Sequence, residues 1–279
     1  MADDVERKFE KLLEILGRFE SVIVAFSGGV DSAFLLSAAH QKLGSKVIAV
    51  TAESVIYPVS ETERARNFAK NLGVEHIVIR SNETEIPEFV ENGPERCYYC
   101  KKAMIDKLKG IAGSRGVPWV VHGANADDPE DFRPGLRAAE EAGIRAPLLE
   151  AGLTKEDIRE ISRAKKLPTW NLPTMACLAS RIPYGTMITA QKLTAVRDAE
   201  QCLERLGFRQ SRVRHHGTTA RIELPTESFG KIIDPVRRTA VVEAFRSIGF
   251  YHVALDLEGY VSGKMNRELL PKFKEDPPR

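Results

Sequence analysis

The sequence lacks the features that would assign it to a membrane or to the secretory pathway. No apolar run approaches the roughly 18 residues that a transmembrane helix needs. Residues 1–6 are acidic and amphipathic, unlike a signal peptide. The net charge is only +2 in 279 residues, so it gives no reason to expect nucleic acid or an anionic membrane as a partner. We therefore expect a cytoplasmic globular protein whose partners include neither of these.

Cysteine is also scarce, with four residues in the chain. Cys202 has the spacing of a buried helical position, and we assign it no chemistry. Cys97 and Cys100 form a close pair between basic residues, which favour thiolates. Cys177 lies in a loop bounded by prolines, a kind of segment that carries function more often than packing. In a reducing cytoplasm such cysteines favour metal binding or catalysis over a structural disulfide.

The spacing of Cys97, Cys100 and Cys177 leaves three kinds of site open. Three thiolates can bind a [4Fe–4S] cluster and leave one iron without a protein ligand. Three cysteines and a histidine can hold a structural zinc ion, with His122 as one candidate. Cys97 and Cys100 can also form a redox-active disulfide.

Short apolar strands alternate with helices over the first two thirds of the chain. This alternation predicts an α/β fold with a doubly wound parallel sheet. After about residue 185 the pattern changes to a smaller α+β arrangement. We expect one domain over residues 1–185, a second over 186–270 and a flexible tail over 271–279. The expected strands cover residues 22–26, 46–51, 76–80 and 117–122.

A glycine turn joins the first expected strand to a helix. Gly28 and Gly29 let the backbone approach an anion, and the N–H groups of the helix start attract phosphate. Ser27 and Ser32 add hydroxyl donors, whereas the Asp31 carboxylate suits Mg²⁺. Because active sites of such sheets lie at the carboxyl ends of the strands, the loops that follow the strands are expected to converge there.

The hexapeptide SGGVDS, residues 27–32, resembles the PP-loop of ATP pyrophosphatases, and no Gly-Lys-Ser/Thr follows it as in a Walker P-loop. The resemblance implies that ATP is split into AMP and pyrophosphate. Residues 122–128, HGANADD, resemble the Gly-x-Asn-x-Asp motif of the same superfamily, in which Gly123 permits close approach to the nucleotide. In this group the edge at Thr51 reads adenine through backbone groups. The expected ATP-binding residues are Ala25, Phe26, Ser27, Gly28, Gly29, Asp31, Ser32, Thr51 and Gly123, with Mg²⁺ on Asp31.

Three motifs occur together in this chain: SGGVDS, RCYYCK and ACLASRIPYG. Together they resemble the LarE family of ATP-dependent pyridinium-3,5-biscarboxylic acid mononucleotide sulfur transferases, over nearly the whole chain. The resemblance implies that ATP adenylates a substrate carboxylate and that a sulfur nucleophile then displaces AMP, leaving a thiocarboxylate. The cycle repeats on the second carboxylate, in the biosynthesis of the nickel-pincer cofactor used by lactate racemase. A homo-oligomer, with a hexamer as one form, is also implied, and the sulfide donor is not identified.

The cysteine count separates this chain from part of that family. Some members have only the cysteine that matches Cys177, and they give up its sulfur. This chain also has Cys97 and Cys100, and so resembles the members that hold a cluster carrying an extra sulfide. We therefore expect the cofactors ATP, Mg²⁺ and a [4Fe–4S] cluster ligated by Cys97, Cys100 and Cys177.

Basic residues near the C-terminus suit the phosphate and carboxylates of such a substrate. Strand alternation puts Arg212 and Arg214 on one face, and the resemblance assigns both to the substrate phosphate, with a solvated basic edge as the alternative. Glu200 and Glu223 are weaker candidates for orienting substrate or metal, because residue type alone favours a surface position. Ser180 and Arg181 flank Cys177 and can stabilise charge on a carbonyl oxygen. The expected catalytic residues are Cys177, Ser180, Arg181 and Glu200, and the expected substrate-binding residues are Arg212, Arg214, Asn125, Asp128 and Glu223.

Three other functions remain open from the sequence. A tRNA-thiolating PP-loop enzyme can also use three cysteines, but this chain lacks an obvious basic, aromatic-rich RNA-binding module. A synthetase that uses the adenylate to form an amide leaves the cysteines without a role beyond a structural zinc site. A zinc-stabilised ATP-binding module without enzymatic activity binds nucleotide and releases no pyrophosphate.

Overall fold

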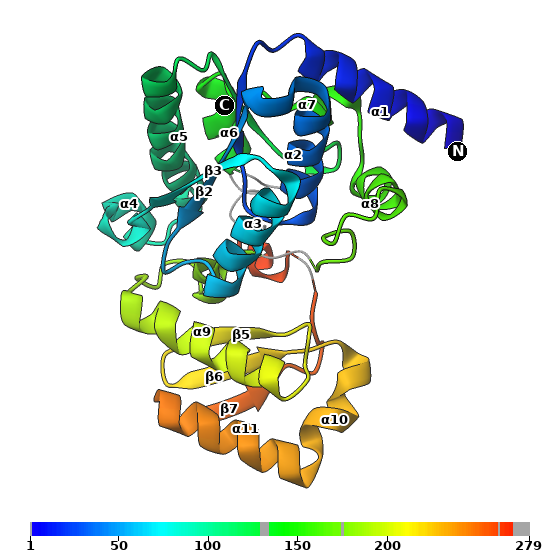
Figure 1. Ribbon diagram of the computed structural model, residues 1–279. Helices are drawn as coiled ribbons and strands as arrows, with labels where there is room; N and C mark the ends of the chain where they lie inside the picture. Colours follow the sequence, from blue (N-terminus) through cyan, green and yellow to red (C-terminus); the bar gives the residue numbers. More distant parts are fainter. Residues whose placement is uncertain (1, 129–133, 174–175, 262, 270–279) are drawn as a thin grey trace. The chain divides into compact units, whose positions relative to one another are not determined.

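The computed structural model describes residues 2–128, 134–173, 176–261 and 263–269 (Figure 1). The chain forms two compact units, and each consists of two stretches that are separate in the sequence. The first consists of Met1–Asn82 and Cys97–Met175, and the second of Glu83–Arg96 and Ala176–Arg279. The expected tail, residues 271–279, lies outside the described residues.

A parallel sheet with the strand order β3-β2-β1-β4 forms the centre of the first unit. β1 is central because its residues are apolar and buried, and it pairs in parallel with both β2 and β4. The predicted parallel sheet is confirmed. The strands are β1 (Val22–Ala25), β2 (Val47–Glu53), β3 (Glu75–Arg80) and β4 (Trp119–His122).

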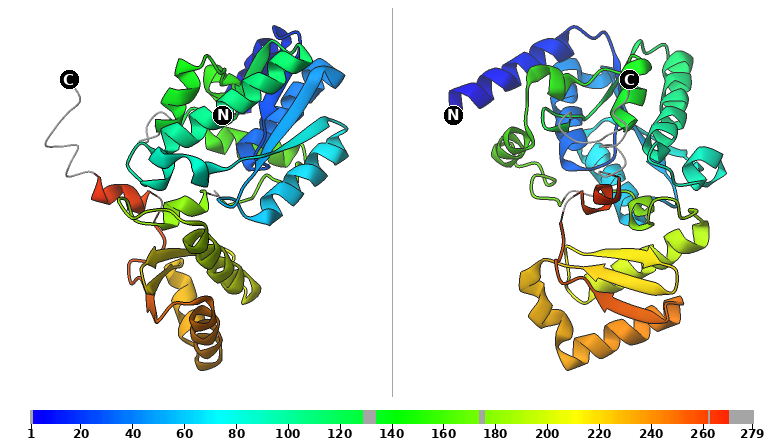
Figure 2. Two further views of the ribbon diagram at one scale, coloured as in Figure 1. Left: turned by 90° about the vertical axis from the view of Figure 1, so that its left-hand side faces the viewer. Right: turned by 180° about the vertical axis from the view of Figure 1, so that it is seen from behind.

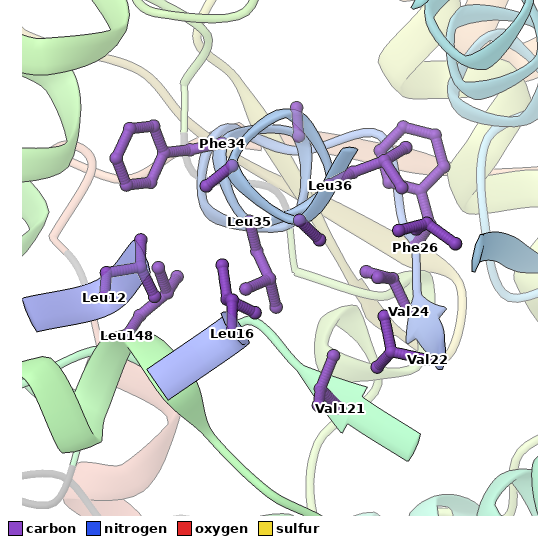
Figure 3. Close-up of a cluster of buried hydrophobic side chains, with 14 of the residues drawn as sticks. Leu12, Leu16, Val22, Val24, Phe26, Phe34, Leu35, Leu36, Val121 and Leu148 are labelled. Carbon is purple, nitrogen blue, oxygen red and sulfur yellow. The ribbon is translucent and has the colours of Figure 1, made fainter. Parts of the chain in front are cut away.

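Helices cover both faces of this sheet, as a doubly wound fold requires (Figures 1 and 2). Alternate residues of β1 enter separate cores, with Val22 and Val24 in one and Ile23 in the other. The first core also contains apolar residues of α1 and α2, and Figure 3 shows Leu16 and Leu35 among them. The second contains residues of α5 and α6. The helices are α1 (Ala2–Gly17), α2 (Val30–Leu43), α3 (Val59–Leu72), α5 (Arg96–Arg115), α6 (Pro134–Glu141), α7 (Pro147–Ala151) and α8 (Lys155–Ala164).

The second unit contains a three-stranded sheet of order β5-β6-β7 and its own core. β5 and β6 are antiparallel, whereas β6 and β7 are parallel. Cys202 of α9 is buried in this core, as predicted. The main elements are β5 (Arg212–His216), β6 (Thr219–Glu223), β7 (His252–Leu255), α4 (Pro87–Val90), α9 (Ala190–Arg205), α10 (Phe229–Ile233) and α11 (Pro235–Ile248), with the short helix η4 (Leu178–Arg181).

None of the helices in the described part of the chain combines the length and the apolar character that crossing a bilayer requires.

Candidate active site

The loop between β1 and α2 has the geometry of an anion-binding turn. Gly28 adopts φ +77°, where a side chain is strained, and an added Cβ would lie 3.2 Å from the Cβ of Ala65. Gly29 occupies the N-cap of α2 and has no side chain with which to cap it. The first N–H groups of α2 therefore face outward, with the positive end of the helix dipole behind them.

The two serine hydroxyls of this loop contact each other. Their Oγ atoms lie 3.0 Å apart, and the Ser27 N–H donates to the Ser32 Oγ at 3.3 Å. The Ser32 hydroxyl also reaches the Gly29 carbonyl at 3.3 Å. Both hydroxyls thus hold the turn in shape, and both lie at the position where phosphate oxygens are expected.

Thr51 connects the ends of neighbouring strands. Its hydroxyl donates to the Phe26 carbonyl at 2.6 Å and lies 2.8 Å from Nε2 of His76. Burial, followed by the charge of Arg66, lowers the pKa of His76, so the ring is neutral at pH 7. His76 was not singled out in the sequence, because a lone histidine in a strand gives no motif.

Asp31 forms an ion pair with Lys155 at the start of α8. The other carboxylate oxygen, Oδ1, is buried and has no hydrogen-bond partner among the described residues. Burial raises the pKa of Asp31, and the nearby Lys155 opposes that shift. An orphaned carboxylate oxygen beside a phosphate loop fits Mg²⁺, which binds through one or two carboxylates together with phosphates and water. Lys155 was missed from the sequence, because it lies 124 residues from Asp31.

The loop after β4 approaches the start of α2 closely. A Cβ on Gly123 would lie 3.0 Å from the backbone nitrogen of Ser32. Gly123 is therefore required for contact between two backbones, a role that the motif alone did not indicate. Asn125 and Asp128 are both buried, and the Asn125 N–H donates to Asp128 Oδ2 at 2.8 Å. Asp127 follows the same turn, since its N–H donates to Asn125 Oδ1 at 3.0 Å.

Cys97 and Cys100 lie three residues apart in the first turn of α5, and so share one side of the helix. Cys97 is exposed, Cys100 is half-buried and all four cysteines of the chain are thiols. Burial lowers the pKa of Lys101, and the adjacent Cys100 opposes the shift. Burial, followed by the charge of Lys101, lowers the pKa of His122 to about 3, which leaves a neutral ring. Within the described residues, no three His, Cys, Asp or Glu side chains form a group that could hold a metal ion.

Arg181 organises the Cys177 segment of the second unit. Its side chain is 1% exposed, and it donates to Glu200 Oε1 at 2.8 Å and Oε2 at 3.0 Å. It also donates to the carbonyls of Ala176 and Cys177 at 2.7 and 3.2 Å, while Ser180 Oγ donates to the Cys177 carbonyl at 2.8 Å. Burial opposes the charge of Arg181, but Glu200 outweighs that effect and raises the pKa of Arg181. Three expected catalytic residues, Ser180, Arg181 and Glu200, are therefore in direct contact with one another or with the Cys177 backbone.

Arg214 and Glu223 form a second buried pair. Two nitrogens of Arg214 donate to the Glu223 carboxylate at 3.0 and 2.7 Å, and a third donates to the Ser180 carbonyl at 2.7 Å. Glu223 is fully buried and Glu200 is largely so, which makes the expectation of surface carboxylates wrong for both. Each carboxylate can be buried because a guanidinium donates a hydrogen bond to each of its two oxygens.

Arg212 completes a group of three guanidinium side chains with Arg181 and Arg214. It lies on β5 as predicted, 5.3 Å from the ring centroid of Tyr260, and donates to the Ser211 carbonyl at 2.8 Å. Burial, followed by the nearby charge of Arg181, lowers the pKa of Arg212. Arg212 and Arg214 are buried, so the alternative of a solvated basic edge does not hold. Arg221 also pairs with Glu223 at 3.2 Å, so several guanidinium groups gather around Glu200 and Glu223, an arrangement of cationic side chains suited to an anionic group.

Comparison with known proteins identifies the family to which the chain belongs. The asparagine synthase family model matches residues 17–107, which include the phosphate loop. The chain is 38% identical to the pyridinium-3,5-bisthiocarboxylic acid mononucleotide synthase of Lactiplantibacillus plantarum, over 92% of this chain and 93% of that protein. It is also 42% identical to the uncharacterized protein slr1717 of Synechocystis, over 95% and 99% of the two chains, and 32% identical to the uncharacterized protein MJ0830 of Methanocaldococcus jannaschii, over 87% and 92%. With a phosphate loop of this geometry and near full-length similarity, the chain belongs to the LarE family of ATP-dependent sulfur transferases within the PP-loop group.

Proposed function

We propose that this enzyme adenylates the carboxylates of pyridinium-3,5-biscarboxylic acid mononucleotide and converts them to thiocarboxylates in nickel-pincer cofactor biosynthesis. The observation that carries the proposal is the network of Arg181, Ser180 and Glu200 around the backbone of Cys177. A synthetase that forms amides gives this arrangement no task. The similarity to the Lactiplantibacillus plantarum synthase supports the choice of substrate.

The first half-reaction takes place at the phosphate loop. The N–H groups at the start of α2, with Ser27 and Ser32, hold the phosphates of ATP. A carboxylate oxygen of the substrate attacks the α-phosphorus, the bond to the β-phosphate oxygen breaks, and pyrophosphate leaves. Asp31 would hold Mg²⁺ through its unpartnered Oδ1, and the ion would neutralise charge on the departing pyrophosphate. The resulting acyl adenylate carries AMP as a good leaving group.

The second half-reaction transfers sulfur. Sulfide attacks the acyl carbon, the bond to the AMP oxygen breaks, and a thiocarboxylate remains. Arg181 is oriented by Glu200 and stabilises the negative charge that develops on the acyl oxygen. Arg212 and Arg214 bind the substrate phosphate, and Glu223 orients Arg214. Asn125 and Asp128 orient the substrate.

We further propose that Cys97, Cys100 and Cys177 hold a [4Fe–4S] cluster. The chemistry of the donor set suits the cluster, because all three side chains are thiols and two of them share one side of a helix, although the described residues do not gather three such ligands into one group. When bound, this group supplies sulfide on the iron that no cysteine ligates. The external source of that sulfide is not identified. A zinc ion held by the same cysteines and His122 is the competing arrangement.

The test is to purify the protein without oxygen and to measure iron, zinc and acid-labile sulfide per chain. About four irons and at least four sulfides, sharply reduced in Cys97→Ala and retained in the matched control Cys202→Ser, support the cluster. Zinc near one per chain, or no metal, contradicts the cluster. The hypothesis to test is then that Cys177 gives up its own sulfur.

A second measurement separates the alternative functions. Pyrophosphate release that depends on the pyridinium substrate supports the proposed reaction, and a mass increase of 16 per converted carboxylate identifies the thiocarboxylate. A tRNA gel shift that weakens with salt supports thiolation of tRNA instead. Full activity of a variant with Cys97, Cys100 and Cys177 all changed to alanine supports an amide-forming synthetase. Light scattering after gel filtration tests the proposed homo-oligomer.

A further inference from the structure

Asn92 lies at the centre of a contact between two distant segments of the second unit. Its side-chain Nδ2 donates to the carbonyls of Pro183 and Thr186 at 2.7 and 2.8 Å, and more weakly to that of Ile182 at 3.3 Å. Its backbone carbonyl accepts the N–H of Gly185 at 3.0 Å. Asn92 is 0% exposed, so these bonds are shielded from water.

The backbone of Asn92 confirms that this position is specialised. It adopts φ +59°, the left-handed region that asparagine tolerates better than most residues. In the described part of the chain, Lys166 at φ +57° is the other residue besides glycine with a positive φ. The left-handed turn directs the Asn92 amide towards the carbonyls of the 182–186 loop, which follows Cys177 and Arg181 in the sequence.

The same side chain also holds the residue that precedes Cys97. Oδ1 of Asn92 accepts a hydrogen bond from Nη1 of Arg96, the first residue of α5. The Arg96 guanidinium lies 4.4 Å from the ring centroid of Tyr184, within the range of a cation–π contact. Arg96 is buried, and its Nε has no hydrogen-bond partner among the described residues. Asn92 therefore contacts both the chain that leads into Cys97 and the loop that follows Cys177.

We propose that Asn92 is a positioning residue for sulfur transfer, which holds the segment that leads into Cys97 against the 182–186 loop that follows Cys177. This inference rests on the proposed function, in which Cys97, Cys100 and Cys177 act on one group. The amide is suited to the task because it donates through Nδ2 to the 182–186 loop and accepts through Oδ1 from Arg96. A carboxylate keeps the acceptor and loses the donors.

Asn92→Asp tests this role, because it preserves size and still accepts from Arg96. Asn92→Gly removes the whole side chain and keeps the left-handed turn, and Lys166→Gly controls for glycine at a positive φ. In Asn92→Asp we expect hydrogen exchange at Gly185 and Ile188 to rise about tenfold, the effect of losing one to two net hydrogen bonds. We also expect iron and acid-labile sulfide to fall at least fivefold, with the ATP Kd within twofold of the unaltered protein and Lys166→Gly unchanged.

Two results overturn the inference. Faster exchange with unchanged iron and sulfide shows that the contact does not position the cysteines. Loss of ATP binding in both Asn92 variants, with Lys166→Gly unaffected, shows a purely structural role.

If the unaltered protein holds no iron, the proposed cluster is wrong, and the role of Asn92 needs a measurement that does not depend on iron. The inference is then judged by peptide-resolved alkylation of the reduced protein with iodoacetamide. Rates at Cys97 and Cys177 that change at least fivefold in Asn92→Asp, with Cys202 unchanged, support it. Unchanged rates at both overturn it.

Discussion

Replacing Glu200 by glutamine is expected to destabilise the second unit more than any exposed charge substitution. The Glu200 carboxylate accepts from Nε and Nη2 of Arg181 and from the backbone N–H of Val213 at 3.0 Å. Glu200→Gln preserves the size but removes the charge, and it turns one acceptor into a donor that faces the guanidinium. Arg181 is 1% exposed, so water cannot replace the lost partner.

The expected magnitude follows from this burial. Removing one partner of a buried ion pair costs about 3–5 kcal/mol, because the remaining charge is left without compensation. A domain of ordinary stability has an unfolding free energy of roughly 5–15 kcal/mol, so the loss is a large share of the total. Glu258→Gln is the control, since Glu258 pairs with Arg267 through two hydrogen bonds of 2.7 and 2.9 Å, but the side chains are 46% and 51% exposed. Its second partner, Lys264, keeps an ion pair with Asp256 at 2.7 Å when Glu258 is changed. Water screens such a pair, and we expect little change.

Urea unfolding followed by circular dichroism measures the two variants against the unaltered protein. Because the two units can unfold separately, hydrogen exchange of peptides from α9 and β5 assigns the change to the second unit. A large shift in Glu200→Gln beside a negligible one in Glu258→Gln is the expected pattern. Equal, small shifts would refute the reasoning, because they would show that Arg181 finds another partner or becomes hydrated.

Three further predictions concern the first unit. His122 stays neutral in the folded state down to about pH 3, whereas the unfolded histidine binds a proton below about 6.5, so stability falls as the pH drops through this window. His122 accounts for about 2 kcal/mol of the unfolding free energy that is lost between pH 7 and pH 5, and His122→Asn should abolish that part. The urea midpoint of the variant should therefore decrease less over this pH range than that of the unaltered protein. Asp31→Asn should weaken MgATP binding at least tenfold in calorimetry while ATP without Mg²⁺ is less affected, and equal effects on both would argue against a metal on this carboxylate. Gly28→Ala should cost about 1–3 kcal/mol in chemical unfolding, and more than Gly73→Ala. Their φ angles are +77° and +75°, but an added Cβ meets Ala65 at Gly28 and nothing within 4 Å at Gly73.

Local patterns predicted much of the fold. Short β-branched runs buried on both faces identified β1 and β2, since a parallel strand needs no alternation of polar residues. The sequence pattern also indicates helices over residues 189–206 and 234–248, the second with Pro235 in its first turn, and the structure has α9 and α11 there, capped by Thr189 and Asp234. Ser60 and Glu63 have the spacing of a capping box at a helix start, but that interpretation is wrong, because α3 begins at Val59, after Pro58, without a side-chain cap.

The candidate site could be predicted less completely, because its contacts join residues far apart in the sequence. A glutamate such as Glu223 is expected at the surface until its arginine partner is known, and a strand pairing brings the two together. Lys155 gives no local signal either, since its role depends on Asp31. Motifs indicated which residue types gather at the site, whereas the partners that hold them come from tertiary structure.

The discontinuity of the second unit also sets an order for folding during synthesis. The carbonyls that accept from the Asn92 side chain lie 90 to 94 residues later in the chain. At a synthesis rate of about 5–20 residues per second, residue 92 leaves the ribosome roughly 5–20 s before its partners. During that interval the 83–96 segment has no native partner from residues 176 onward, although β3 is already made and β4 follows early in the same interval. Phe89 of this segment is buried in the folded protein, so the nascent segment carries apolar surface of the kind that chaperones bind until its partners are made.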